Sequence, residues 1–368
     1  CIPSHTSTHP HTPLTHPQPL APTMSQTGVI IVGCGVPKRG MGWYHATNLL
    51  DNLCPSAVLT DIVEPWFLGP GASSPPGLAF ARFAAAAAAS HGVRFHAAVA
   101  NVPAKTASPY RLALISGRTA DNPRLLVDVV EIAGATHVFL EKPGAPSVPD
   151  LLRMREFASA KGVPILMGYN KNVTAYVTEA RAFEARTPGA ETTFVHNNAY
   201  AESELPECFE RNAEGMLKNM AVHELALLAT FYGVTADNIA KITPDRAYSR
   251  VLTLPGPSSN KPFTDFAAVG FTITTTAGKT VTVKANRTGG SFSEAIVTVA
   301  GVEKLRTKTP DPALEKRVAA KMAADPDIMP YFPLQHDDYV ELKERAASHI
   351  AAGKPGVPDG MADINVAI

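Results

Sequence analysis

Glycines follow the first apolar run of the chain at a spacing that suits a phosphate-binding loop. The segment 28–35 reads GVIIVGCG, so Gly33 and Gly35 end a run typical of a buried parallel strand. Glycines there allow a tight turn and let backbone N–H groups approach a pyrophosphate at the next helix N-terminus. The usual third glycine follows three residues later. Here we align Gly42, which leaves four extra residues in the loop, among them Lys38 and Arg39, whose charges could reach a phosphate. A plain glycine turn is the alternative.

Glu64 ends the second apolar run, AVLTDIVE. A carboxylate at this strand end can accept hydrogen bonds from the adenosine ribose hydroxyls, and it repels a 2′-phosphate. This favours NAD over NADP. Lys38 and Arg39 favour NADP if the longer loop folds over the ribose. A solvated carboxylate at a strand end is the alternative interpretation of Glu64.

A histidine and an asparagine, His223 and Asn219, lie four residues apart in a segment predicted to be one helix over 216–232. That spacing places both on one helix face. His223 also falls in an apolar stripe, so we expect it to point inward. An imidazole titrates near neutral pH and is suited to proton transfer. A satisfied core histidine is the alternative.

Between positions 28 and 170, alternating strands and helices must position the glycine loop and Glu64. Short apolar runs predict strands at 28–35, 57–64, 93–99, 111–116, 136–143 and 163–169. Helices are expected between them, at 42–53, 77–90, 123–134 and 147–162. Ser147 is the expected N-cap of the last helix, and Gly162 lies just past its end. The alternation predicts a parallel sheet with helices on both faces.

The pattern changes after residue 170. A helix at 173–186, a strand at 191–200 and the helix at 216–232 precede a hairpin, 265–275 and 279–286, that turns near Gly278. A strand at 292–301 and a helix at 337–352 follow. Val269, Phe271 and Ile273 alternate with smaller neighbours, which predicts a sheet with one packed and one exposed face. We therefore predict an α/β protein with domains over 24–170 and 171–368.

Composition narrows the class of protein. The 368 residues suffice for about two domains, and 33 basic residues balance 33 acidic ones without a long basic run. This argues against binding to nucleic acid or an anionic membrane. The four cysteines form no C-x-x-C pair, so neither a zinc site nor a disulfide framework is expected. We expect no metal site, no membrane span and a reducing, cytoplasmic location.

The first 23 residues are rich in Pro, Thr and His. Such a segment has few large apolar side chains to bury, so we expect residues 1–23 to form a disordered tail. Metal binding by its histidines is the alternative. Met24 is the expected natural start.

Three further segments make a family resemblance specific. They are Glu141-Lys142-Pro143 after a strand, GVPILMGYNKN over 162–172, and NAEGMLKNMAVHELALL over 212–228. With the glycine loop, the chain from Gly28 to its C-terminus resembles the glucose–fructose oxidoreductase / inositol dehydrogenase / MocA family. The resemblance implies a Rossmann domain followed by an α/β domain with a large, mostly antiparallel open sheet. It also implies NAD(P)-dependent hydride exchange with a sugar or polyol carbon, and homodimers or homotetramers formed through the sheet.

The resemblance assigns catalytic roles. Lys142 matches the lysine that reaches the reacting oxygen, although a strand-end lysine paired with Glu141 is the alternative. His223 matches the general acid/base. Asn219 stands where the family has Asp, so it can orient the imidazole but cannot stabilise imidazolium by charge. Ser116 and Glu141 are expected beside the cofactor.

Four residues are expected to contact the substrate. Tyr169, Asn170 and Lys171 follow the last Rossmann strand, where the family places substrate contacts. Arg118 lies in an unusual loop, and its planar guanidinium suits a carboxylate or phosphate. A surface arginine is the alternative. Arg118 and Lys171 together predict an anionic substrate.

Two other functions stay open at this point. A non-catalytic sensor that binds dinucleotide without turnover is favoured by the missing Asp. A redox-neutral NAD-dependent glycoside hydrolase is the other alternative.

Overall fold

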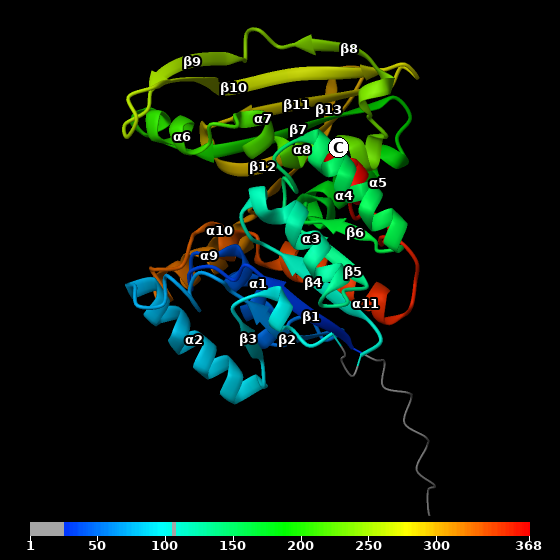
Figure 1. The fold of residues 1–368 in the computed structure, drawn as a ribbon. Helices are drawn as coiled ribbons and strands as arrows, with labels where there is room; N and C mark the ends of the chain where they lie inside the picture. The colour runs from blue at the N-terminus through cyan, green and yellow to red at the C-terminus, as the bar shows by residue number, and fades with distance from the viewer. Residues whose placement is uncertain (1–25, 105–107) are drawn as a thin grey trace, which may run out of the picture.

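The computed structural model describes residues 26–104 and 108–368, which form two sheets with helices between and around them. Figure 1 shows the first sheet in the lower half of the molecule and the second at the top. The predicted tail over 1–23 and the expected start at Met24 lie outside the described residues.

The first sheet, sheet A, has six strands in the order β3-β2-β1-β4-β5-β6, all parallel. Its strands are β1 (Thr27–Val32), β2 (Ala57–Val63), β3 (Arg94–His96), β4 (Arg111–Ile115), β5 (His137–Leu140) and β6 (Ile165–Met167). The order reverses between β1 and β4, and ligands of such sheets bind beyond the carboxyl ends of the strands at that point. The predicted Rossmann-type parallel sheet is confirmed.

Helices connect these strands as expected. They are α1 (Met41–Leu50), α2 (Pro75–His91), α3 (Asn122–Glu131) and α4 (Val148–Lys161), with short 3-10 turns η1 (Val99–Asn101) and η2 (Thr119–Asp121). Ser147 caps α4 by accepting a hydrogen bond from the Asp150 backbone N–H, and Gly162 ends it with a φ of +65°. Both end signals were correctly predicted, because serine supplies the missing acceptor and glycine tolerates the left-handed conformation.

The second sheet, sheet B, has the path β13-β12-β7-β11-β10-β8, with β9 paired to β10. Its strands are β7 (Ala190–Ala199), β8 (Ile239–Pro244), β9 (Arg250–Pro255), β10 (Pro262–Thr275), β11 (Thr280–Asn286), β12 (Thr288–Val299) and β13 (Val302–Thr309). Only β7 and β11 pair in parallel. The predicted large, mostly antiparallel sheet is therefore confirmed, including the hairpin at Gly278. The sequence did not predict β8, β9 or β13, whose side chains are mostly exposed.

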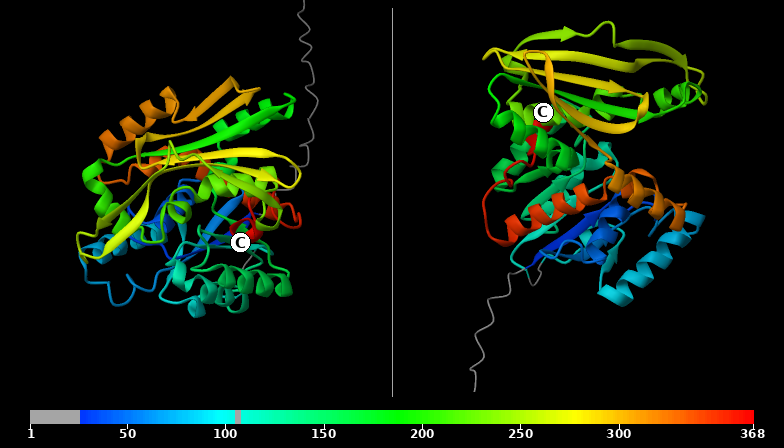
Figure 2. Two further views of the ribbon diagram at one scale, coloured as in Figure 1. Left: turned by 90° about the horizontal axis from the view of Figure 1, so that it is seen from above. Right: turned by 180° about the vertical axis from the view of Figure 1, so that it is seen from behind.

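Helices cover one face of sheet B, the face toward sheet A (Figures 1 and 2). The segment begins with η3 (Asn170–Val173) and α5 (Ala175–Ala185), followed after β7 by η4 (Glu202–Glu204), α6 (Leu205–Arg211), α7 (Met216–Asn219), α8 (Val222–Tyr232) and η5 (Ala236–Asn238). Val177 of α5 and Leu227 of α8 pack on Phe194, Ile273 and Val283 of the sheet. These alternate strand positions face the core, as predicted.

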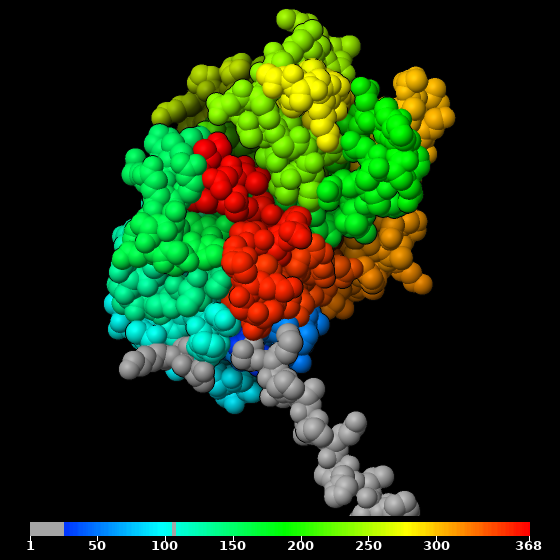
Figure 3. All heavy atoms as spheres, turned by 90° about the vertical axis from the view of Figure 1, so that its right-hand side faces the viewer, coloured from blue at the N-terminus to red at the C-terminus, as the bar shows by residue number. Residues whose placement is uncertain are grey.

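The chain finally returns to sheet A. After α9 (Pro312–Ala324) and α10 (Tyr331–Leu334), helix α11 (His336–Ala351) packs Leu342 and Ala346 into the core under β1 and β2. The last helix, α12 (Ile364–Ala367), lies against α4 and β6. Figure 3 shows this C-terminal segment on the surface between the two halves of the molecule. Helix α11 also contacts η3, and α12 also contacts α8, so both helices join the segments on either side of residue 170. The division at residue 170 stays a prediction.

Candidate active site

The glycine loop lies at the carboxyl end of β1 and has the backbone that its glycines were expected to provide. Gly33 and Gly35 have φ of +84° and +76°, in the left-handed region that favours glycine. A methyl group at Gly42 would lie 2.1 Å from the carbonyl oxygen of Gly33, so only glycine allows α1 to pack this closely on the strand end. Gly33 also lies against Gly117, where a methyl group on Gly33 would come within 2.7 Å. The sequence analysis had not singled out Gly117.

The inserted part of the loop does not have the expected role. Lys38 Nζ forms an ion pair of 2.8 Å with Asp325 Oδ1, and the Lys38 carbonyl accepts from the Met329 backbone N–H. Arg39 is exposed, and its carbonyl oxygen lies 3.5 Å from the Tyr331 hydroxyl. The insertion thus packs on the segment that follows α9, and Asp325 rather than a phosphate is the partner of Lys38 in this structure; its contact with a phosphate stays a prediction.

The carboxylate of Glu64 is fixed at the mouth of the glycine loop. Its Oε2 accepts from the Gly35 backbone N–H at 2.7 Å, and its Oε1 accepts from Trp66 N–H at 3.2 Å. Glu64 is thus a buried strand-end acceptor rather than the solvated carboxylate of the alternative interpretation. Ser116, at the end of β4, has a buried hydroxyl without a hydrogen-bond partner among the described residues. A buried, unpartnered hydroxyl beside a glycine loop fits a site that a polar ligand completes.

The carboxylate of Glu141 is bound by the buried imidazole of His45. Glu141 Oε1 lies 2.9 Å from His45 Nε2, and Lys343 Nζ lies 3.4 Å from the other ring nitrogen of His45. The expected alternative, a Glu141–Lys142 pair, is therefore not formed. Within 26–104 and 108–368, no hydrogen bond or ion pair joins Lys142 Nζ to another residue. The side-chain nitrogen of Lys142 is therefore available to bind a ligand beside the end of β5.

His223 and Asn219 do not form the predicted pair. The predicted helix over 216–232 is broken at Met220, between α7 and α8, and Asn219 Nδ2 instead donates to Glu214 Oε1 at 3.1 Å. The expected role of Asn219 in orienting His223 is corrected, because the helix break turns the amide toward Glu214.

The His223 ring itself is buried and stands edge-on to Tyr169, with ring centroids 6.0 Å apart. Its Nδ1 has no partner among the described residues. Burial, together with the positive charges of Lys142 and Lys171, holds the pKa of His223 well below its ordinary value. His223 is therefore neutral at neutral pH, with no carboxylate bound to its ring.

A buried ionic cluster lies next to His223, and Lys171 is the one member of it that was predicted as a site residue. Lys171 Nζ donates to Glu224 Oε1 and, at 2.8 Å, to Ser293 Oγ. Glu224 Oε2 lies 3.1 Å from His196 Nδ1. Burial alone raises the pKa of Glu224, but Lys171 and His196 bring it below its ordinary value. Lys171 is therefore neutralised inside the protein, which removes the basis for predicting an anionic substrate from it.

Two signals in the sequence pointed to this cluster. Glu224 is a carboxylate within the apolar segment HELALL, and a buried carboxylate needs a partner. His196 alternates with Thr192 and Phe194 along a strand whose inward face is apolar.

Arg118 is a surface residue. Its side chain is 87% exposed and forms an ion pair of 3.1 Å with Asp121, three residues later. Its guanidinium lies in solvent at the start of η2, as the surface-arginine alternative expects, and the substrate contact stays a prediction.

A polar cavity of about 560 Å³ adjoins the cluster and is lined from both halves of the molecule. Its polar lining consists of Asn170, Lys171, Thr174, His196, Asn197, Asn198, Ser291, Ser293, Thr309, Glu315, Tyr331, Gln335 and Asp338. The Oδ1 atoms of Asn170 and Asn197 are buried without partners in the described structure. Burial and the neighbouring Asp337 raise the pKa of Asp338 to about 7. The walls thus offer amide, hydroxyl, imidazole and carboxyl groups, whereas the charge of Lys171 is already balanced by Glu224.

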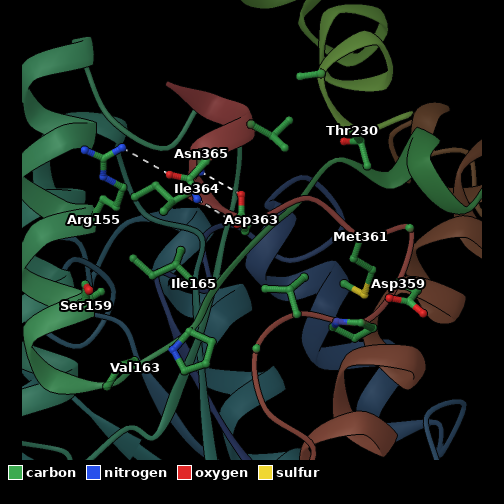
Figure 4. A pocket seen from close by; sticks show the side chains of 18 of the residues that line it. Arg155, Ser159, Val163, Ile165, Thr230, Asp359, Met361, Asp363, Ile364 and Asn365 are labelled. Carbon is green, nitrogen blue, oxygen red and sulfur yellow. Dashed lines mark hydrogen bonds between the residues drawn. The ribbon is translucent and has the colours of Figure 1, made fainter. Parts of the chain in front are cut away.

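Two other cavities differ in character. One of about 740 Å³ is mostly apolar and includes Tyr169, Pro143, Leu217 and Val222. Another of about 790 Å³ lies between α4 and the last residues of the chain. Figure 4 shows that its polar side chains Arg155, Asn365 and Asp363 bond to one another, and it contains none of the predicted site residues.

The described residues lack two other features. No group of three or more His, Cys, Asp or Glu side chains in 26–104 and 108–368 is placed to hold a metal ion. No helix in these ranges is long and apolar enough to cross a membrane.

Comparison with solved structures identifies the fold. The chain is similar to scyllo-inositol dehydrogenase from Lactobacillus casei with bound NAD(H) and scyllo-inositol, at 14% identity, over 93% of this chain and 94% of that chain, with a TM-score of 0.62. It is similar to myo-inositol 2-dehydrogenase from Lactobacillus plantarum, at 16% identity, over 93% and 94% of the two chains, with a TM-score of 0.62. An oxidoreductase from Agrobacterium radiobacter in complex with NAD+, L-tartaric acid and magnesium is 13% identical, over 93% of both chains, with a TM-score of 0.60. No protein-family model and no curated protein matches the chain. The fold is thus the one that the family resemblance implied.

Proposed function

We propose that the protein is an NAD-dependent oxidoreductase that oxidises a hydroxyl-bearing carbon of a neutral polyol or sugar, or reduces the corresponding carbonyl. One observation carries the proposal. A polar cavity, lined by residues that follow β6, adjoins a buried imidazole–carboxylate–lysine cluster, in a fold shared with a solved dehydrogenase that holds NAD(H) and scyllo-inositol.

The residues present fit the dinucleotide. The loop of Gly33, Gly35 and Gly42 would hold the pyrophosphate, since its glycines bring the end of β1 close to the N-terminus of α1. The unpartnered hydroxyl of Ser116 would meet the cofactor at the end of β4. Glu64 would accept from the adenosine ribose. When bound, the nicotinamide ring supplies hydride acceptance or donation.

NAD is favoured over NADP by the charges around this site. The Glu64 carboxylate is fixed beside the glycine loop, where it would repel a 2′-phosphate. Lys38, which could have offset that repulsion, is paired with Asp325.

The chemistry of the cavity supports a neutral substrate. Its walls carry amides and hydroxyls that can donate to and accept from several hydroxyl groups, and Glu224 already balances Lys171. We propose Lys142 and His223 as the side chains that contact the reacting oxygen. The Lys142 ammonium would polarise it, and the neutral imidazole of His223 would complete its hydrogen bonding.

The outer face of sheet B supports assembly into a homodimer or homotetramer. No helix covers it in Figures 1 and 2, and it includes Thr272 and Thr282, which bond to each other at 2.8 Å, and the partly exposed Ile296. Light scattering of the wild type and of Thr272→Lys tests this: the variant should have the mass of a monomer.

The unpaired cysteines Cys34, Cys54 and Cys208 support a cytoplasmic location.

An absorbance screen for NADH tests the activity. Purified protein with NAD is offered polyols, aldoses and sugar acids at one concentration, with Lys142→Ala as the comparison. NADH should form with a neutral polyol or aldose, faster than with any sugar acid, and Lys142→Ala should lose about 10²-fold or more in kcat. NAD binding by calorimetry without turnover of any compound would favour a sensor, and NAD retained with no net NADH would favour the hydrolase.

A further inference from the structure

His196 has its protonation fixed by two neighbours. Its Nδ1 lies 3.1 Å from Glu224 Oε2 and 3.1 Å from the Met220 carbonyl oxygen. Both neighbours are acceptors, so Nδ1 must carry a hydrogen and donate it. In the neutral ring, Nε2 is then left as the acceptor.

That free nitrogen belongs to a side chain that lines the polar cavity. His196 is 16% exposed, and no hydrogen bond joins its Nε2 to a residue in 26–104 or 108–368. It stands on β7 opposite Ser293 of β12, and Ser293 accepts from Lys171. A substrate hydroxyl in the cavity would therefore meet an imidazole nitrogen that is ready to accept a proton.

Glu224 supplies to His196 the charge that Asn219 cannot supply to His223. Glu224 is fully buried and ionised, and its two oxygens bind His196 and Lys171 separately. A carboxylate at Nδ1 holds the ring in one orientation and stabilises the imidazolium that forms when Nε2 takes a proton. His223 has no such partner among the described residues, and two lysines oppose its protonation.

We propose that His196 is the catalytic residue that takes the proton of the substrate hydroxyl, with Glu224 as its positioning residue. This inference rests on the proposed function. The O–H bond of the substrate breaks and its proton passes to His196 Nε2. NAD, when held by the glycine loop, would supply the acceptor for the hydride that must leave the same carbon for the carbonyl to form. In the reverse reaction the imidazolium returns the proton.

The groups that face His196 allow this cycle near neutral pH. Burial and Lys171 lower the pKa of His196, and Glu224 opposes them. Asp338 of α11 lines the same cavity, and the His223 ring lies on the α8 side. The unprotonated base is thus the resting form, and the ionised Glu224 stabilises its protonated form.

Nitrogen-15 NMR of the histidine side chains tests the pair without substrate. The His196 signal, assigned by its loss in His196→Gln, should show protonated Nδ1 and unprotonated Nε2. In Glu224→Gln, which removes the charge beside Nδ1, the ring should become protonated only at a lower pH than in the wild type. If Glu224→Gln fails to fold, the double variant Lys171→Met/Glu224→Gln keeps the cluster neutral and serves instead. A wild-type His196 protonated on Nε2 would overturn the proposal.

Kinetics then test the role, with exposed His91→Gln as the matched control. His196→Gln should lower kcat by ~10²–10⁴-fold and remove the acidic limb of the pH profile, while NAD affinity by calorimetry stays within about twofold. His223→Gln should lower kcat less and keep that limb. The proposed role of His196 would be overturned if a folded His196→Gln kept kcat within a few-fold of the wild type while His223→Gln lost the acidic limb of the pH profile. Failure of the proposed function is distinct: the wild type would then turn over no polyol or sugar, whether or not it binds NAD.

Discussion

Removing the cation of the buried Lys171–Glu224 pair should destabilise the protein strongly. Lys171 is 6% exposed and Glu224 0% exposed, so Lys171→Met leaves a buried carboxylate without its counter-charge. Breaking a buried pair in this way costs about 3–5 kcal/mol. His196 still binds the other carboxylate oxygen at 3.1 Å, so we expect the lower end, about 3 kcal/mol.

Urea unfolding at pH 7, followed by circular dichroism, measures this loss. Lys161→Met is the matched control, because it removes the same side chain from a 2.6 Å pair with Glu131 in which both side chains are nearly half exposed. Such surface pairs contribute about 0–1 kcal/mol. If Lys171→Met lost no more free energy of unfolding than Lys161→Met, the cluster would not be the buried, charge-balanced unit described above.

The pH dependence gives a second check. In the wild type, the pKa of Glu224 is lower folded than unfolded, so its stabilising effect is present above the unfolded pKa, about 4.3, and is lost as pH falls below it. Without Lys171, burial should instead raise the pKa of Glu224 above that value. The destabilisation by Lys171→Met should therefore shrink between pH 8 and pH 5. A difference that stays constant or grows over that range would contradict the assigned charge state.

Three other substitutions test the rest of the site. Gly42→Ala places a methyl group 2.1 Å from the Gly33 carbonyl oxygen, so NAD affinity by calorimetry should fall at least 10-fold; unchanged affinity would remove the glycine loop from the cofactor site. Glu64→Ala should narrow the preference for NAD over NADP, and a wild type that binds NADP more tightly would refute the role of this carboxylate. Asn219→Asp should leave the pH profile of kcat unmoved, since Asn219 bonds to Glu214 rather than to the active-site imidazoles. A shift of that profile would restore the sequence-based pairing.

Local rules predicted most of the first half of the chain. The apolar runs that became β1, β4 and β5 are buried on both faces, so their pattern does not depend on distant residues. End signals such as Ser147 and Gly162 act within one helical turn and were read correctly. The positive φ of Gly33 and Gly35 is likewise a local backbone requirement that only glycine meets without strain.

The edge strands of sheet B escaped prediction for a physical reason. Strands β8, β9 and β13 expose most of their side chains, so they lack the alternation of apolar and polar residues that marks a half-buried strand. Their backbone pairs with β10 or β12, and that partner is visible only in three dimensions.

By itself, the sequence determined the glycine loop, the alternation that builds sheet A and the types of residue available for chemistry. The tertiary structure decided which partner each charged residue has and whether its side chain is buried or exposed. Lys38, Arg118 and Lys171 look alike as isolated cations, yet one pairs with Asp325, one points into solvent and one is buried on Glu224. The reason is that the strength of a charge depends on its burial and its nearest partner. Those partners lie 287, 3 and 53 residues away along the chain, so in two of the three cases no local pattern reports them.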